Sequence, residues 1–259
     1  MKCKMNTFHI SYFIFSSRIA LSPIRVTLLT NMKISPLADS IIVAAGSGSR
    51  FGAAKQFAEL RGMPLYQHSL KMFAEHSMIG RIVLVIAPDD VTRIEKEVCP
   101  IFYGRKIEIA LGGAQRQDSV ANGMQKLEEL GGSEIVLVHD AARPFILPEI
   151  ITNVIRGIEE HGAALAAVPV IDTLKKSEDG FSASTISREN LWRAQTPQGA
   201  RFELLKQALK AAHENNYSAT DEAELLERIG VKPLLVLGDE GNVKITYEKD
   251  LKNYETSTL

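Results

Sequence analysis

The fold is set by residues 40–55, SIIVAAGSGSRFGAAK, in which a short apolar run passes into a glycine-rich loop. The run from Ile41 to Ala44 is small and β-branched, which is typical of a buried strand. The loop that follows carries three glycines and two cations: Gly46, Gly48, Arg50, Gly52 and Lys55. Glycine lets a backbone approach a ligand closely and turn its N–H groups inward, and the cations add positive charge. The stretch therefore indicates a phosphate-binding loop, with an ordinary strand-to-helix connection as the alternative.

Neither of the two common phosphate-binding motifs is present. A P-loop requires G-x-x-x-x-G-K-[ST], and the chain contains no Gly-Lys-Ser or Gly-Lys-Thr. The dinucleotide-binding motif requires G-x-G-x-x-G, but counting from Gly46 its third glycine would fall on Phe51. The loop is thus suited to the phosphates of a nucleotide without matching either motif.

The composition excludes several classes of protein. The 259 residues are 45% hydrophobic, which is enough to bury one large core. The net charge of −1 creates no field that would attract nucleic acid or an anionic membrane. The only cysteines are Cys3 and Cys99, which fits a reducing cytoplasm rather than a disulfide framework. The six histidines lack zinc-ligand spacing, and no apolar run approaches the ~20 residues of a membrane span.

Residues 1–38 differ in composition from the rest of the chain. They contain no Asp or Glu and are rich in hydroxyl groups, as organelle transit peptides are. Their basic residues are Lys2, Lys4, Arg18, Arg25 and Lys33. We favour the alternative that they are an extension upstream of the working initiator, Met32, which makes the protein cytoplasmic rather than imported. We expect disorder there in either case, and a single domain over residues 39–259.

Apolar and amphipathic segments alternate along the chain. After the first strand, further strands are predicted at residues 81–86, 106–110, 134–139 and 163–168. Helices are predicted between them, at residues 64–76, 89–98, 117–130 and 148–161. This alternation predicts an α/β fold, a mostly parallel sheet with helices on both faces. Later in the chain we expect helices at residues 201–215 and 220–228 and closing strands at residues 233–237 and 242–246.

Residues 172–187, DTLKKSEDGFSASTIS, interrupt the alternation. Glu178-Asp179-Gly180 predicts a turn between two short β-prone segments, so this stretch is expected to form a hairpin that projects from the domain. A two-stranded arm buries too little surface to be stable alone. We therefore expect a homodimer in which the partner subunit covers the arm.

Polar clusters follow three of the predicted strands. They lie at residues 46–55, 112–119 (GGAQRQDS) and 140–144 (DAARP). Ligands of parallel sheets bind at the carboxyl ends of the strands, so we expect the three loops to form one site. Asp140, beside the small Ala141, is well placed to hold Mg²⁺ next to a polyphosphate; the alternative is an N-cap for the next helix. His139 is expected to be a packed strand-end residue.

Together these segments resemble a known enzyme family. The motifs AAGSGSR, GGAQRQDSV, HDAARP, IDTLK, RENLWRAQTPQ, TDEAELL and NVKIT are similar, in this order, to those of the 2-C-methyl-D-erythritol 4-phosphate cytidylyltransferases of the non-mevalonate isoprenoid pathway. The resemblance spans residues 40–251, and HDAARP and LWRAQTPQ are its most specific parts. It implies a Rossmann-like nucleotidyltransferase that uses CTP, methylerythritol 4-phosphate and Mg²⁺ and releases a CDP-alcohol and pyrophosphate.

The resemblance also implies roles for individual residues. The CTP-binding set comprises Ala44, Ala45, Gly46, Gly48, Gly113, Arg116, Ser119 and Ala141. The catalytic set comprises Arg50 and Lys55, which match the pair that stabilises the transition state, and Arg188 and Lys244, which hold the incoming phosphate. The sugar-alcohol phosphate would contact Asp140, Arg143, Thr173, Arg188 and Lys244. Thr173 and Arg188 would come from the partner's arm, and Asp140 would also hold the magnesium ion.

Two other functions stay open at this point. The sister family, which makes CDP-ribitol from ribitol 5-phosphate, usually has a bulkier residue where Ala142 stands, and this favours methylerythritol phosphate as the substrate. The other alternative is a nucleotide-sensing module without turnover, which the complete set of Arg50, Lys55, Asp140 and Lys244 disfavours. Since the two reacting phosphates repel each other, positive charge and positioning matter more here than a general base.

Overall fold

The computed structural model describes residues 36–46, 51, 54–98 and 101–255. The chain divides into two units, Met1–Lys33 and Ile34–Leu259, and all the described residues belong to the second unit. The prediction of disorder for residues 1–38 therefore falls almost wholly outside the described residues, as do Gly48 and Arg50 of the glycine-rich loop. Within the described part of the chain, no helix has the length and apolar character that crossing a membrane requires.

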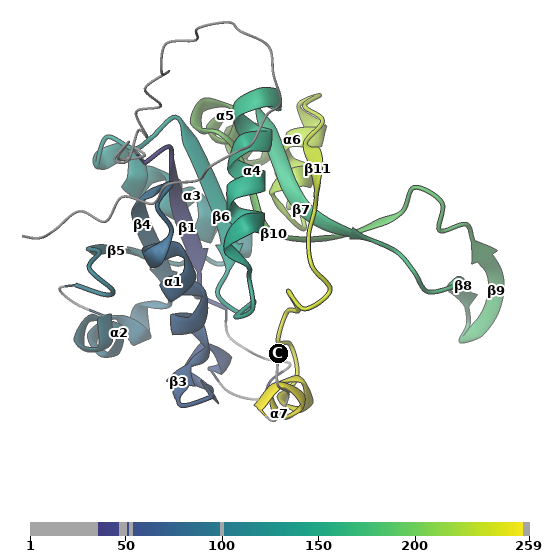
Figure 1. Ribbon diagram of the computed structural model, residues 1–259. Coiled ribbons are helices and arrows are strands. Elements are labelled where there is room, and N and C mark those ends of the chain that lie inside the picture. The colour runs from purple at the N-terminus through teal and green to yellow at the C-terminus, as the bar shows by residue number, and fades with distance from the viewer. Residues whose placement is uncertain (1–35, 47–50, 52–53, 99–100, 256–259) are drawn as a thin grey trace, which may run out of the picture. The chain divides into compact units, whose positions relative to one another are not determined.

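A seven-stranded sheet forms the centre of the second unit, with the strand order β11-β7-β10-β6-β1-β4-β5 (Figure 1). Its strands are β1 (Ala38–Val43), β4 (Ile79–Ile86), β5 (Ile107–Leu111), β6 (Ile135–Asp140), β7 (Ala163–Pro169), β10 (Trp192–Arg201) and β11 (Leu234–Leu237). β1 pairs in parallel with β4 and β6, as do β4 with β5 and β7 with β11, so the predicted mostly parallel sheet is confirmed. β10 alone within this sheet runs antiparallel to its neighbours, β6 and β7.

Helices cover both faces of the sheet, as predicted (Figure 1). α1 (Leu65–Glu75), α2 (Val91–Val98) and α4 (Pro148–His161) pack on one face, and α3 (Arg116–Glu129), α5 (Phe202–Glu214) and α6 (Glu222–Arg228) pack on the other. Successive strand residues point to opposite faces, so Ile42 joins the core under the first three helices and Ile41 the core under the others. Because both cores bury this part of β1, residues 41–43 are apolar without alternation.

The end of the chain differs from the prediction. The predicted strand at residues 242–246 is wrong, because this segment joins no sheet. It is held instead beside the loop after β6, where the Ile245 N–H donates to the Ala142 carbonyl oxygen at 2.9 Å. The segment leads into α7 (Glu248–Glu255), a helix that the sequence pattern does not predict. Its short polar turns lack the long apolar stripe that identifies a helix from sequence.

Several short elements lie between the main strands and helices. The 3₁₀ turn η1 (Lys55–Phe57) carries Lys55 and is followed by the small hairpin of β2 (Glu59–Leu60) and β3 (Met63–Pro64). A second 3₁₀ turn, η2 (Pro88–Asp90), precedes α2. A small third core, which includes Leu60, Ala142 and Ile245, joins this hairpin to the end of the chain. The segment after β11 is thereby packed next to Lys55.

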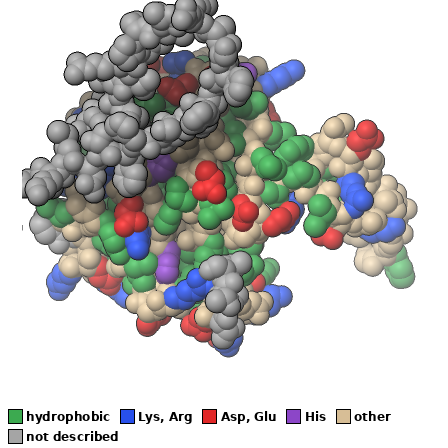
Figure 2. All heavy atoms as spheres, viewed as in Figure 1, with side chains coloured by type: hydrophobic (Ala, Val, Ile, Leu, Met, Phe, Trp, Pro, Cys, Tyr) green, Lys and Arg blue, Asp and Glu red, His purple; other side chains and the backbone are tan. Residues whose placement is uncertain are grey.

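The hairpin predicted at residues 172–187 is present as β8 (Leu174–Glu178) and β9 (Phe181–Ile186). Its turn residues Asp179 and Gly180 both have positive φ, 48° and 83°, which suits a tight hairpin turn. This arm forms a sheet of its own and stands away from the seven-stranded sheet (Figure 1). Hydrophobic side chains lie on its surface (Figure 2), including Phe181, which is 79% exposed. The arm therefore has the projecting form that was predicted, and its cover by a partner subunit stays a prediction.

Candidate active site

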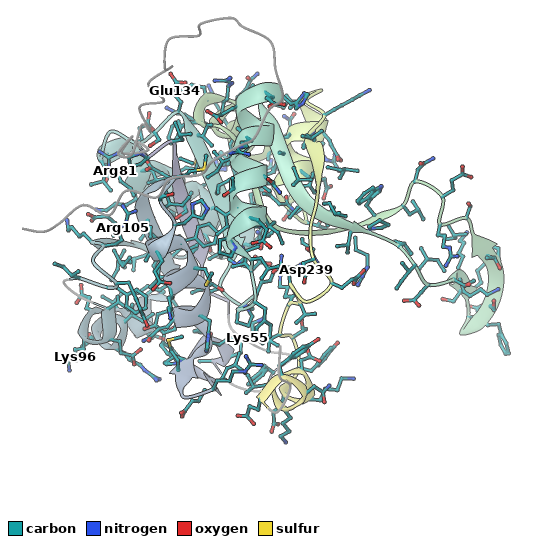
Figure 3. The ribbon with its side chains drawn as sticks, in the orientation of Figure 1. Lys55, Arg81, Lys96, Arg105, Glu134 and Asp239 are labelled. Carbon is teal, nitrogen blue, oxygen red and sulfur yellow. The ribbon has the colours of Figure 1, made fainter. Side chains whose placement is uncertain are left out.

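A pocket of about 440 Å³ opens at the carboxyl ends of the parallel strands. It is lined by the loops after β1, β5 and β6, by η1 and by the segment before α7. Figure 3 shows Lys55 at the end of the sheet opposite Glu134, which directly precedes β6. The predicted residues in its lining are Ala44, Ala45, Gly46, Lys55, Gly113, Arg116, Ser119, Asp140, Ala141 and Lys244. Loops that are distant in sequence thus meet in one cavity.

Glycine allows the loops after β1 and β5 to approach each other at this pocket. A Cβ on Gly112 would lie 2.3 Å from the Ala45 Cβ, and a Cβ on Gly113 would lie 2.3 Å from the Asp118 Cβ. The Gly113 N–H donates to Ser119 Oγ at 3.1 Å, which fixes the loop against the first turn of α3. A side chain at either glycine would push the facing residue away. This wall of the pocket is therefore made of backbone.

Asp140 is the centre of a charge network in the pocket. Its Oδ2 accepts a hydrogen bond from Lys244 Nζ at 2.6 Å, and its Oδ1 accepts one from Arg116 Nε at 3.1 Å. The residue is only 7% exposed. Burial by itself would raise the pKa of Asp140, but the charges of Arg116 and Lys244 hold that pKa well below its usual range. Asp140 is therefore an ionised carboxylate at neutral pH.

Arg116 joins this network to helix α6. Its terminal nitrogens donate to Glu222 Oε1 at 2.6 Å and to Glu222 Oε2 at 3.0 Å. Burial would lower the pKa of Arg116, but Glu222 and Asp140 raise it above its ordinary value. Our sequence reasoning missed Glu222, because an acidic residue at the start of a helix ordinarily faces solvent and favours the dipole. The available signal was its spacing from Leu225 and Leu226, which places Glu222 on the apolar face.

The backbone around Asp140 is held by strand β10. The Asp140 N–H donates to Thr196 Oγ1 at 3.1 Å, and this hydroxyl lies 3.0 Å from His139 Nδ1. Burial lowers the pKa of His139 to about 4, so the ring is neutral and Nδ1 accepts from Thr196. The other ring nitrogen, Nε2, then donates to the Arg143 carbonyl oxygen at 3.2 Å. His139 is packed, as predicted, and the N-cap alternative for Asp140 is wrong, since the next helix begins only at Pro148.

Two cations hold the segment that carries Lys244. Lys55 Nζ donates to the Ile245 carbonyl oxygen at 3.2 Å, and Arg143 donates from a terminal nitrogen to the Asn242 carbonyl oxygen at 2.7 Å. Lys55 lines the pocket, whereas Arg143 is absent from the described lining. In this structure Arg143 therefore acts on the pocket through the segment that carries Lys244.

Thr173 and Arg188 are not brought to the pocket of their own chain. Thr173 directly precedes β8 and Arg188 follows β9, and both side chains are exposed. Neither belongs to the pocket lining among the described residues. Their roles as substrate contacts stay predictions, which require the arm to reach the pocket of another subunit.

The structure also places unpredicted polar residues in the pocket lining. Gln56 and Gln115 both line it, each next to a residue that the sequence did single out. Gln56 is buried, and its side-chain amide donates to Asp90 Oδ2 at 2.9 Å, which ties η1 to η2. Gln115 lies within residues 112–119, which were expected to form the site, although no role was predicted for it, and the signal for Gln56 was its position next to Lys55.

Enzymes that transfer nucleotidyl groups surround a polyphosphate with backbone loops and cations at the strand ends of an α/β sheet, and the fold and pocket place the chain in this class. Comparison with known proteins narrows the class. The family model for 2-C-methyl-D-erythritol 4-phosphate cytidylyltransferase matches residues 39–257. The chain belongs to this family, as the motifs predicted, and its reaction is the transfer of CMP from CTP to 2-C-methyl-D-erythritol 4-phosphate.

Individual relatives carry the same name. The enzyme of Shouchella clausii (strain KSM-K16) is 41% identical over 219 residues, which cover 84% of this chain and 94% of the relative. That of Geobacillus kaustophilus (strain HTA426) is 40% identical, covering 82% of this chain and 93% of the relative. The crystal structure of the Thermus thermophilus enzyme matches with a TM-score of 0.69 at 30% identity, covering 86% of this chain and 98% of the other. The predicted Rossmann-like nucleotidyltransferase fold is thereby confirmed.

Proposed function

We propose that the transfer of CMP takes place in the pocket around Asp140, by in-line attack of the sugar-alcohol phosphate on the α-phosphorus of CTP with Mg²⁺ present. The observation that carries this proposal is the ionised, buried Asp140 with Lys244 at 2.6 Å and Arg116 at 3.1 Å in a cavity that Lys55 also lines. Such a site places cationic side chains where the two reacting phosphates must meet. It supplies electrostatic stabilisation and positioning, the two effects on which phosphoryl-type transfers depend most.

The loops after β1 and β5 are the proposed binding site for CTP. Ala44, Ala45 and Gly46 offer backbone on one side of the pocket, and Gly113 and Ser119 lie on the other. Backbone N–H groups around a phosphate act as fixed positive dipoles. Gly48 belongs to the same proposed loop but lies outside the described residues. The close packing of Gly112 on Ala45 keeps the two loops in register.

Asp140 is the proposed protein ligand of Mg²⁺, and its surroundings fit that role. Mg²⁺ is commonly bound through one or two carboxylates together with substrate phosphates and water. Among the described residues there is no group of three or more metal-binding side chains, so a single carboxylate shared with CTP is the form of site available. When bound, Mg²⁺ offsets the charge of the phosphates and orients them. In the free chain, Lys244 and Arg116 keep the Asp140 carboxylate ionised and oriented.

Cations of the pocket are proposed to act on the two phosphates. Lys55, with Arg50 of the adjoining loop, would stabilise the charge that develops on the α-phosphate and the leaving pyrophosphate. Lys244 would hold the incoming phosphate as a point charge. The phosphate oxygen that attacks is already anionic, so no side chain needs to remove a proton from it. Arg50 lies outside the described residues, and its role rests on the sequence motif.

The arm is proposed to complete the site of a second subunit in a homodimer. Thr173 and Arg188 flank the hairpin and are exposed, as residues that serve another chain would be. Arg188 could grip a phosphate through the two parallel hydrogen bonds that a guanidinium makes. Two observations support this proposal. Arg188 is absent from the described lining of its own chain's pocket, and the arm carries exposed apolar side chains. The cytoplasmic location stays a prediction from the sequence.

The test is to mix the purified protein with CTP, Mg²⁺ and either methylerythritol 4-phosphate or ribitol 5-phosphate, and to measure released pyrophosphate. We expect release with methylerythritol 4-phosphate and its loss when Asp140→Asn replaces the wild type. Release with ribitol 5-phosphate alone would refute the substrate assignment. CTP binding in a calorimeter without any product would instead support the nucleotide-sensing alternative.

A further inference from the structure

The proposed reaction assigns no task to one buried carboxylate of the charge network around Asp140, which is Glu222. Glu222 is 1% exposed and lies at the start of α6, on the side of Arg116 away from Asp140's contact with Nε. A buried carboxylate is unfavourable unless it is paired, and Glu222 has both oxygens on the guanidinium of Arg116. A surface salt bridge would have left it exposed. The buried pair of Glu222 and Arg116 therefore connects α6 to the lining of the pocket.

The guanidinium of Arg116 has its directions set by these two carboxylates. Nε–H points to Asp140, while each terminal nitrogen gives one N–H to Glu222. The other N–H of each terminal nitrogen has no partner among the residues that the structure describes. Arg116 also lines the pocket. A planar guanidinium that is fixed at three nitrogens presents its remaining N–H groups in a fixed direction.

The start of α6 is itself fastened to strand β10. Asp221 caps the helix by accepting from the Glu224 N–H at 2.9 Å. The Gln198 side chain donates to Asp221 Oδ2 at 3.0 Å and accepts from the Ala223 N–H at 3.0 Å. Glu222 thus stands between two residues that Gln198 holds. Its side chain starts from a fixed backbone position.

The same strand holds the other carboxylate of the network. Two residues before Gln198, Thr196 accepts the backbone N–H of Asp140. β10 therefore sets the distance between Asp140 and Glu222, and Arg116 spans that distance. A side chain that only neutralised Arg116 would need no such common support. The shared anchoring points to orientation of Arg116 as the task.

We propose that Glu222 is a positioning residue for CTP binding, which holds Arg116 in the orientation that serves both Asp140 and the nucleotide. This inference rests on the proposed function, because it takes the pocket to be the CTP site. Without Glu222, the terminal nitrogens of Arg116 would turn to the nearest acceptor, Asp140. That carboxylate would then be less available to Mg²⁺. Glu222 leaves Asp140 with one contact from Arg116 rather than two.

The direct test is to replace Glu222→Gln and measure CTP binding by calorimetry in the presence of Mg²⁺ and without the second substrate. Glutamine has nearly the same shape but removes the charge and one of the two acceptors. We expect the dissociation constant for CTP to rise about tenfold, the size of one charge-assisted hydrogen bond. The KM for CTP should rise with it, while the KM for methylerythritol 4-phosphate stays within about twofold.

A matched control is Glu227→Gln, on the same helix with the same change of charge but an exposed side chain. It should leave the CTP dissociation constant as in the wild type. A Glu222→Gln protein that melts at a lower temperature but binds CTP like the wild type when folded would overturn the proposal, because the role would then be structural only. Equal rises in both KM values would overturn it as well.

The double variant Arg116→Met/Glu222→Gln keeps the test open if the single variant does not fold, because it leaves no unpaired buried charge. We expect it to bind CTP at least tenfold more weakly than the wild type. Wild-type affinity in this variant would overturn the proposal. If the wild type binds CTP and forms product, and both Glu222 variants bind CTP with the same affinity, only the positioning role is refuted. A wild type that does not bind CTP would refute the proposed function itself.

Discussion

The pocket and the arm of this chain are held in different ways. In the pocket, Asp140, Arg116 and Glu222 are mutually paired and largely withdrawn from water. In the arm, all of β9 is exposed, and Phe181 at its start keeps 79% of its surface accessible. Among the described residues, these charges of the pocket are paired by contacts within one chain. The arm is defined by its own hairpin hydrogen bonds and lacks a covering layer in the described chain (Figures 1 and 2).

The difference separates what one chain supplies from what assembly would add. Charges in the pocket are positioned by strands that pack on two cores, so their geometry belongs to the fold. Arg188 and Thr173 have no comparable support, since they flank an arm that contacts little besides itself. Substitutions in the pocket should therefore change chemistry and folding strongly. Substitutions in the arm should act through the second substrate and through association.

The largest effect is expected from Lys55→Ala in the pocket. Loss of one donor that stabilises charge in a transition state lowers kcat by about 10²–10³-fold. Lys106→Ala is the matched control, because Lys106 is an exposed lysine paired with Glu108 outside the pocket lining. Steady-state pyrophosphate release measures both variants. A Lys55→Ala enzyme within a few-fold of the wild-type kcat would remove Lys55 from the catalytic set.

The second expected effect concerns the buried His139 behind the pocket. Burial lowers the pKa of His139 from its ordinary value of 6.5 to about 4 in the folded chain. As pH falls, the imidazole therefore takes up its proton in the unfolded chain before it does so in the folded chain. The stability that the neutral ring contributes is complete above pH 6.5 and is lost as pH falls towards 4, by up to about 3 kcal/mol. Urea unfolding of the wild type at pH 7 and pH 4.5 should show this loss.

A His139→Gln variant should show a flatter dependence of unfolding free energy on pH over that range. The control is His161→Gln, the same substitution at an exposed histidine of α4. The depressed pKa of Asp140 acts at lower pH, because its stabilisation is lost only as pH falls below the ordinary range of a carboxyl group. Parallel curves for wild type and His139→Gln would contradict the prediction.

A smaller effect is expected from Arg188→Ala in the arm. The KM for methylerythritol 4-phosphate should rise about tenfold, while kcat and the KM for CTP change little, because the guanidinium would contact only the second substrate. Lys176→Ala, an exposed cation on the same arm, is the control. Steady-state kinetics with each substrate varied in turn measures the split. A change confined to the KM for CTP would place Arg188 elsewhere.

The smallest effect on the stability of the chain is expected from deleting residues 175–183 of the arm. The melting temperature should move by no more than a few degrees, because the exposed hairpin contributes little packing to the body. Light scattering should show a monomer in place of a dimer. An unchanged dimer mass after the deletion would mean that another surface joins the subunits.

Much of the fold could be predicted because local patterns carried it. The helix at 148–161 coincides with α4, which begins at Pro148 and ends before Gly162 in the left-handed conformation. The parallel strands read as apolar runs because each is buried on both faces. β10 escaped prediction because the polar side chains of QTPQ find partners only after folding: Thr196 binds Asp140 and His139, and Gln198 binds the start of α6. No local pattern reveals a strand whose polar groups are satisfied by distant residues.

By itself, the sequence determined the alternation of strands and helices from β1 to β7, the glycine-rich loops at the strand ends and, through its motifs, the family and its reaction. The tertiary structure decided which charges meet: Lys244 and Asp140 are 104 residues apart in the chain and 2.6 Å apart in the pocket, and the partner of Glu222 is Arg116, 106 residues away in the chain. Propensity and periodicity act over a few residues, whereas the pairing of charges depends on burial and on distances in space. A carboxylate acquires its role from the cation that the fold places against it.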